Sequence, residues 1–165
     1  MKKGENRQKR GFTIIEVVLV LAIAGLIFLM MFIALPALNR AQRDSRRRDD
    51  ISIFLKKVKD YQTNNRGTLP PDLNEWNKMV SDYIGDFEDP NGESYVLLVR
   101  NCNQSNLGTE CQGALNDTTT FPNGHTLTIF KAATCDGERA LQSSNPRKIA
   151  VQYKLEGGGI YCANT

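Results

Sequence analysis

Two residues at the edge of a long apolar segment have types and positions that could carry chemistry: Gly11 and Glu16. Gly11 lies where a basic stretch gives way to the apolar segment, and it has no side chain that would hinder access to its backbone. Glu16 is an acidic residue in an apolar helix, which costs about 2.5 to 3.5 kcal/mol at mid-membrane and less near an end. We therefore expect Glu16 to have a partner. The alternative is that it reaches the membrane interface and is stabilised by the dipole of the helix N-terminus.

The element that positions these residues is the apolar run of residues 17–35, which contains no charge. Its nineteen residues, at about 1.5 Å per residue, span nearly the ~30 Å hydrocarbon core of a bilayer. The run predicts a membrane-inserting helix. An ordinary secretory signal has a shorter apolar stretch that ends at an Ala-x-Ala-like site, which Ala34-Leu35-Pro36-Ala37 does not offer.

The charges that flank the apolar run do not fix its orientation. Five basic residues precede it and five follow it closely: Lys2, Lys3, Arg7, Lys9 and Arg10, then Arg40, Arg43, Arg46, Arg47 and Arg48. With equal numbers of basic residues on the two sides, the positive-inside rule favours neither orientation. Topology must therefore come from the motif at Gly11.

Residues 11–16 read Gly-Phe-Thr-Ile-Ile-Glu and, with the basic leader and the apolar helix, resemble the type IV prepilin signature from about Lys9 to Leu38. The resemblance implies that residues 1–11 are a leader peptide that a prepilin peptidase removes between Gly11 and Phe12. It also implies N-methylation of Phe12. Glu16 would then pair with the α-amino group of Phe12 on a neighbouring subunit and guide assembly.

The resemblance implies a structural subunit of a type IV pilus, a homo-oligomeric helical filament that supports adhesion, twitching motility or uptake. Its partners would be the prepilin peptidase/methylase and a membrane assembly platform with an ATPase motor. The precursor would lie in the cytoplasmic (inner) membrane with its head outside the cytoplasm, and the filament at the cell surface. Two alternatives stay open: a minor pilin or pseudopilin of a type II secretion or competence system, and a monomeric membrane-anchored binding module.

The expected fold class is α+β, with a long N-terminal helix packed on a small antiparallel sheet, as the pilin resemblance implies. Residues 12–36 would form the membrane and filament-core part of the helix, residues 37–66 its amphipathic second half, and residues 67–165 the head. Pro36 leaves the carbonyl of Phe32 without its helical donor, and Gly25 is a second weak point. We expect the helix to loosen at these two residues.

Apolar spacing predicts how the second half of the helix packs. Ile51, Phe54, Leu55, Val58 and Tyr61 lie on one helical face, and Gly67 suits the left-handed position that ends the helix. A second, short helix follows, with Asp72 as its N-cap and Glu75 three residues later; Leu73, Trp76, Val80 and Tyr83 or Ile84 would share one face.

The chain from residue 95 onward has the pattern of strands, at residues 95–99, 127–130, 148–155 and 160–162. Within residues 148–155, apolar and polar side chains alternate, which predicts a sheet with one buried face. Gly157-Gly158-Gly159 permits a hairpin into the last strand. Residues 101–120 form a long polar loop. Loops of this length are uncommon unless they have a function or are held by a disulfide.

Four cysteines, Cys102, Cys111, Cys135 and Cys162, all lie in the expected head, and none forms a Cys-x-x-Cys motif. This spacing argues against a zinc site. An even count in a small domain outside the cytoplasm indicates two disulfides, for which three pairings exist. We favour Cys102 with Cys111 and Cys135 with Cys162; four buried reduced cysteines are the alternative.

Charge and motif content indicate neither nucleic-acid binding nor catalysis. The net charge of the chain is +3, and the first ten residues alone contribute +4. The remaining residues therefore sum to −1 and lack the basic surplus that nucleic-acid binding needs. The charged run 43–50 is expected to be solvated, with pairs such as Asp44 with Arg47 or Arg48; bridges between subunits are the alternative. His125 is expected to be structural or exposed. No nucleophile elbow, phosphate loop or metal-ligand spacing occurs, so we predict neither an enzyme, a cofactor nor a metal.

Overall fold

The computed structural model describes residues 11–103, 106–113 and 125–165. The chain divides into two compact units, Met1–Asn39 and Arg40–Thr165. Helix α1, Ile14–Asn64, contributes to both units, and helical structure continues through Pro36. The two units are described separately below.

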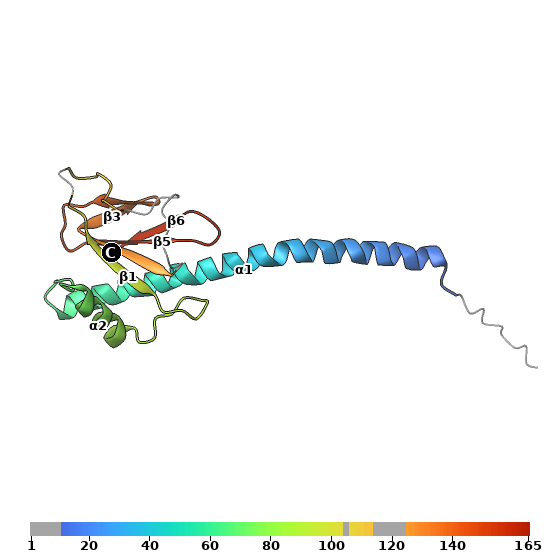
Figure 1. Cartoon of the computed structure of the whole chain (residues 1–165), viewed down its shortest axis with the longest axis horizontal. Coiled ribbons are helices and arrows are strands. Elements are labelled where there is room, and N and C mark those ends of the chain that lie inside the picture. The colour runs from blue at the N-terminus through green and yellow to red at the C-terminus, as the bar shows by residue number, and fades with distance from the viewer. Residues whose placement is uncertain (1–10, 104–105, 114–124) are drawn as a thin grey trace, which may run out of the picture. The chain divides into compact units, whose positions relative to one another are not determined.

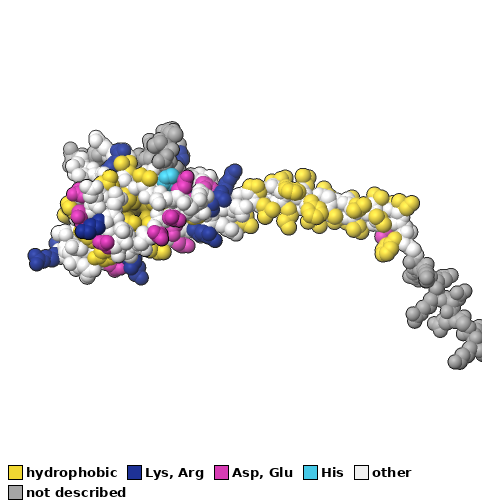
Figure 2. Space-filling view, turned by 60° about the horizontal axis from the view of Figure 1, so that its bottom comes forward, with side chains coloured by type: hydrophobic (Ala, Val, Ile, Leu, Met, Phe, Trp, Pro, Cys, Tyr) yellow, Lys and Arg dark blue, Asp and Glu magenta, His cyan; other side chains and the backbone are white. Residues whose placement is uncertain are grey.

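In the first unit, the large apolar side chains of α1 are exposed to solvent. Figure 2 shows hydrophobic side chains along this segment, and Phe12, Ile14, Leu26 and Phe32 are each more than half exposed. The apolar part of α1 is long enough to cross a membrane, and none of it is buried within the chain. Apolar surface of this extent needs lipid or protein to cover it.

In the second unit, α1 presents the predicted apolar face to the head. Ile51, Phe54, Leu55 and Val58 are buried there. The helix ends as expected for a left-handed termination, but Arg66 takes the first left-handed position, with φ 57°, and Gly67 follows it with φ 80°. The N–H of Gly67 donates to the carbonyl of Gln62 over 2.6 Å, which satisfies one terminal carbonyl.

Helix α2, Leu73–Tyr83, begins at the predicted N-cap. Asp72 Oδ1 accepts a hydrogen bond from the N–H of Glu75 over 3.0 Å. The buried residues of α2 are Trp76 and Met79, whereas Leu73 is exposed, so the expected apolar face was wrong at its first position. The ring of Trp76 stacks on that of Phe54 with centroids 6.1 Å apart, which joins α2 to α1.

The main sheet of the head contains β1 (Val96–Asn101), β2 (Thr126–Lys131), β5 (Ile149–Lys154) and β6 (Ile160–Asn164), in the order β1-β2-β5-β6. These are the four strands that the sequence predicts, and the α+β fold class is confirmed. One pair corrects the antiparallel expectation: β1 and β2 are parallel, so the sheet is mixed. The long segment between them allows the chain to return to the same end of the sheet.

A second hairpin, β3 (Ala133–Asp136) and β4 (Arg139–Gln142), was not predicted. In Figure 1 it lies on the opposite side of the main sheet from α1. The hairpin explains why the expectation of one buried face on β5 was wrong. Ala150 and Gln152, on the face expected to be exposed, are completely buried, and Gln152 Nε2 donates to the carbonyl of Glu138 over 2.7 Å.

Two apolar cores follow from these three layers. The core between the helices and the sheet contains Ile51, Phe54, Leu55, Val58, Trp76, Met79, Tyr95, Leu97, Leu127, Ile129, Ile149, Val151, Tyr153 and Leu155. The smaller core between the sheet and the second hairpin contains Cys102, Cys111, Phe130, Ala133, Ala140 and Ala150. The first core holds α1 against the sheet, and the second holds the hairpin.

Two disulfides connect parts of the head, with the pairing that we favoured. Cys102–Cys111 lies just after β1, and the N–H of Cys111 donates to the carbonyl of Ala140 on β4 over 2.9 Å. Cys135–Cys162 joins β3 to β6. Asn101, the first residue of the expected polar loop 101–120, belongs to β1, and residues 104–105 and 114–120 of that loop lie outside the described residues.

Candidate functional site

The residues of the prepilin-like motif lie at the start of α1. The carbonyl of Thr13 accepts hydrogen bonds from the N–H groups of Glu16, over 3.1 Å, and Val17, over 3.3 Å, so the first helical turn begins directly after Phe12. Phe12 and Glu16 line one hollow of about 320 Å³ together with Val17, Val20 and Leu21. The bond proposed for cleavage and the isolated carboxylate are therefore about one helical turn apart.

Gly11 is a glycine for which the fold of the described chain gives no reason. A Cβ atom built on Gly11 meets nothing within 4 Å, and no left-handed backbone angle is found there. Packing and backbone conformation are the usual structural reasons for a glycine. Among the described residues, neither reason applies to Gly11.

Glu16 lies in the first turn of α1, and its neighbours on the helix are apolar. No ion pair among the described residues includes Glu16. The N-terminus of the helix favours a carboxylate, typically by 0.3 to 1 kcal/mol, which is less than the ~2.5 to 3.5 kcal/mol cost at mid-membrane. If the helix enters an apolar environment beyond the interface, the helix dipole alone does not compensate the free-energy cost of burying the charge of Glu16.

A second charged site, which the sequence did not predict, surrounds Arg47 in the head. Arg47 is only 1% exposed. Its Nε donates to Asp89 Oδ2 over 2.7 Å, its Nη1 to Asp44 Oδ1 over 3.0 Å, and its Nη2 to Glu156 Oε1 over 2.8 Å. The expectation of a solvated run was therefore wrong at Asp44 and Arg47: they do pair, but the pair is buried and belongs to a larger group, the Arg47 cluster.

The Arg47 cluster connects α1 to two loops of the head. Asp89 lies between α2 and β1, and it also accepts a hydrogen bond from the hydroxyl of Tyr153 on β5 over 3.0 Å. Asp44 accepts the backbone N–H groups of Glu156, over 3.0 Å, and Gly157, over 2.8 Å, in the turn between β5 and β6. One end of the head is thus fixed to the helix by polar contacts rather than by apolar packing.

The pKa values of the cluster follow from these contacts. Hydrogen bonds from Arg43 and Arg47 lower the pKa of Glu156 to about 2, against the opposing effect of burial. Burial favours the neutral form of Asp89, but the hydrogen bonds from Arg47 outweigh it and hold the pKa of Asp89 below its usual value. Burial opposes the charge on Arg47, yet its bonds to Asp89 and Glu156 raise its pKa. All three groups are therefore charged at neutral pH.

A signal for this cluster was present in the sequence. The buried face of α1 in the head extends backward from Ile51 by four residues to Arg47 and by seven to Asp44, which are helical repeats. The predicted apolar face began at Ile51 because Arg47 and Asp44, the two preceding positions on the same face of the helix, are charged. Continuing the spacing through charged residues would have placed both side chains against the head.

The remaining predicted residues are distributed over the two units. Gly25 and Pro36 lie within α1, and a Cβ atom at Gly25 meets nothing within 4 Å. His125 precedes β2, and its Nδ1 lies 2.7 Å from Glu93 Oε2. Among the described residues, no group of three or more His, Cys, Asp or Glu residues could hold a metal ion.

Residues 6–32 match the family model described as the prokaryotic N-terminal methylation motif. The match covers the second half of the basic leader, the Gly11–Phe12 junction, Glu16 and most of the apolar run. In this N-terminal segment the chain is similar to type IV pilin-like proteins, which carry a prepilin-type signal. Comparisons with curated proteins and with solved structures gave no match.

Proposed function

We propose that this chain is a structural subunit of a type IV pilus, cleaved between Gly11 and Phe12 and assembled through α1. The observation that carries the proposal is the combination of a methylation motif with a helix whose apolar first part is not buried within the chain and has a single carboxylate near its start. Neighbouring copies of the same helix would cover this apolar surface. Transfer from lipid to such a bundle is nearly balanced in hydrophobic terms, so specific contacts decide the register.

Glu16 would supply one of these specific contacts. Cleavage after Gly11 creates a new amine on Phe12, and the carboxylate of Glu16 on a second copy would neutralise it inside the apolar bundle. A buried charge that loses its partner costs about 3 to 5 kcal/mol. This pairing would therefore favour one register between neighbouring helices.

The test is mass spectrometry of surface filaments combined with substitution of Glu16. Filaments should contain this chain as their main component, starting at Phe12 with a methylated amine. Glu16→Ala should leave membrane insertion intact but strongly reduce filament yield, whereas Glu16→Asp should retain part of it. Val17→Ala is a matched control that shortens a neighbouring side chain without changing charge.

The competing functions predict other results. A minor pilin or pseudopilin would also start at Phe12 but would be present in small amounts or in a short periplasmic assembly. A monomeric membrane-anchored binding module would function normally after Glu16→Ala. A mature protein that retains residues 1–11 would contradict the whole proposal.

A further inference from the structure

Three cations of the head surround one hollow, and none has an acidic partner in the part of the chain that the structure describes. The hollow, of about 350 Å³, is lined by Lys59, Gln62, Thr63, Arg66, Gly67 and Arg147, and we call it the basic hollow. None of the ion pairs found among the described residues includes Lys59, Arg66 or Arg147. All three side chains are exposed.

The local structure holds these cations together. Gln62 Nε2 donates to the backbone carbonyl of Arg147 over 2.8 Å, which fixes the segment before β5 to the end of α1. The guanidinium carbon of Arg147 lies 3.1 Å from the position that a Cβ atom on Gly67 would occupy. The arginine can lie this close because Gly67 has no side chain. The basic hollow is therefore organised by the fold.

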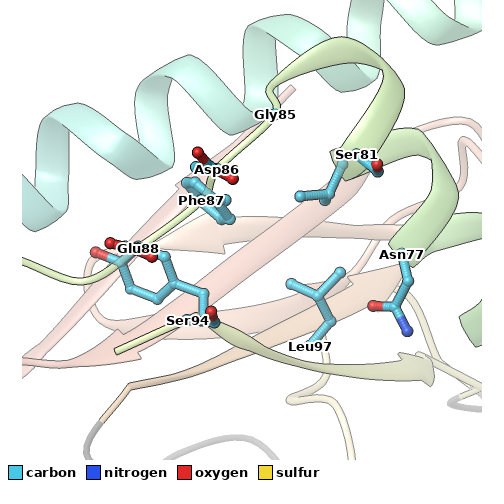
Figure 3. A pocket seen from close by; sticks show the side chains of 10 residues that line it. Asn77, Ser81, Gly85, Asp86, Phe87, Glu88, Ser94 and Leu97 are labelled. Carbon is cyan, nitrogen blue, oxygen red and sulfur yellow. The ribbon is translucent and has the colours of Figure 1, made fainter. Parts of the chain in front are cut away.

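A second hollow of the head carries two acidic residues, Asp86 and Glu88. It measures about 200 Å³ and is lined by Asn77, Val80, Ser81, Gly85, Asp86, Phe87, Glu88, Ser94, Tyr95 and Leu97; we call it the acidic hollow. Figure 3 shows Asp86 and Glu88 on either side of Phe87 in the segment after α2. Both carboxylates are exposed, and neither belongs to an ion pair among the described residues.

The size and lining of the acidic hollow suit a basic side chain. Pockets for small molecules usually measure about 300 to 1,000 Å³, so a hollow of about 200 Å³ is too small for most of them. Two carboxylates beside an aromatic ring match an arginine, because a guanidinium pairs with carboxylates and also contacts aromatic faces. The basic hollow offers two such arginines, Arg66 and Arg147.

We propose that the basic hollow of one copy docks against the acidic hollow of the next copy. The two hollows share no residue, so each copy can use both at once. A contact between two different patches of the same chain is heterologous and, when it does not close into a ring, produces an open helical assembly. The proposal rests on the filament function and adds a contact between heads to the contacts between helices.

Charge reversal in the full-length chain tests this docking. Arg66→Glu with Arg147→Glu, and separately Asp86→Lys with Glu88→Lys, should each reduce the recovery of sheared filaments at least roughly tenfold, because like charges then face each other. Combining all four substitutions in one chain should restore recovery. Producing the two reversed chains together should also restore it, since they can alternate. Lys56→Glu with Glu110→Lys, which reverses exposed charges outside both hollows, should change little.

Two outcomes of the charge reversals would overturn the docking proposal. Recovery could be unaffected by either reversal, or it could be lost in both and not regained in the combined variant, as would happen if another anion occupied the basic hollow. If the thermal midpoint shows that a reversed head unfolds, the milder pair Arg66→Gln with Arg147→Gln decides: it should lower recovery without changing that midpoint, and unchanged recovery would reject the docking. If the wild-type chain forms no filaments, the filament function itself fails, which is a different result from a wild-type filament that tolerates the reversals.

Discussion

Arg47 and Asp89 are 42 positions apart in the chain and meet through two hydrogen bonds, of 2.7 and 3.1 Å, with both side chains almost completely buried. Two parallel bonds of this kind fix orientation as well as distance. Because water has little access, neither partner can be replaced by solvent. This pair therefore holds the loop that carries Asp89 against α1, in addition to the hydrogen bonds within the loop itself, such as that from the N–H of Asn91 to Asp89 Oδ1 over 2.8 Å.

The first prediction concerns the loss of one partner. Arg47→Ala should lower the free energy of unfolding by about 3 to 5 kcal/mol, because it leaves buried carboxylates without compensation. Urea denaturation of the full chain in detergent measures this, with the fluorescence of Trp76, the one tryptophan in the chain and completely buried, as the signal. Arg46→Ala, at an exposed neighbouring position, should change the same quantity by no more than about 0.5 kcal/mol. Equal losses in the two variants would contradict the role of the cluster.

The second prediction concerns acid. Glu156 and Asp89 have lowered pKa values in the folded chain, and that of Glu156 is about 2. Their contribution to stability is complete above their unfolded pKa values, about 4.3 and 3.9, and is lost as the pH falls toward the folded values. The urea midpoint should therefore fall between about pH 4.3 and pH 2.

Two variants separate this effect from general acid denaturation. Glu156→Gln should be less stable than the wild type at neutral pH and should show a smaller fall below about pH 4.3. Asp50 has the opposite effect on the pH dependence of stability. Burial raises its pKa, so the folded chain binds this proton more readily than the unfolded chain does. Asp50→Asn should accordingly leave a steeper fall in acid. The same slope in all three chains would argue against these assignments.

The third prediction compares the disulfides. Cys135–Cys162 closes a separation of 27 residues and Cys102–Cys111 one of 9. The chain-entropy model assigns the longer closure about 3.6 kcal/mol and the shorter about 2.7 kcal/mol. Replacing both cysteines of a pair by serine should therefore lower the urea midpoint more for the Cys135–Cys162 pair. A larger effect of the Cys102–Cys111 pair would indicate that its contacts with β4, and not loop closure, dominate.

The fourth prediction concerns α1 in the first unit. Gly25→Ala meets no steric obstacle and should stabilise the helix by about 1 kcal/mol. Pro36→Ala should restore the hydrogen bond to the carbonyl of Phe32. Amide hydrogen exchange in detergent should slow around each site. If loosening at these residues serves filament extension, both variants should also give filaments that stretch less under load; unchanged exchange would show that neither residue loosens the helix.

Local patterns in the sequence predicted the parts of the fold that local physics decides. The methylation motif was evident because several requirements coincide within six residues, and Asp72 was recognised as an N-cap because its partner, Glu75, is three residues away. The four strands of the main sheet were found from their apolar content. Their boundaries differ from the expected ones by one or two residues, as is usual for element ends.

The parts that were missed depend on contacts between distant segments. The burial of Gln152 requires the second hairpin, which covers the face of β5 that alternation assigned to solvent. The hairpin itself had a signal, Asp136-Gly137, a turn dipeptide between two short strands. The Arg47 cluster brings together residues from α1, the loop before β1 and the turn after β5, and no single stretch of sequence indicates that these would meet.

The parallel pairing of β1 and β2 has a consequence for how this protein can vary through evolution. Parallel neighbours require a crossover connection of about a dozen residues or more, and residues 102–125 supply it here. Shortening this segment beyond that limit would break the sheet, whereas lengthening it costs only about 0.6 kcal/mol for each doubling. The fold thus sets a minimum length for the segment but no maximum, and it constrains the start of the segment through the buried Cys102–Cys111 disulfide. Insertions can accumulate after Cys111 while the paired strands stay constant, so this is the natural place for related chains to diverge.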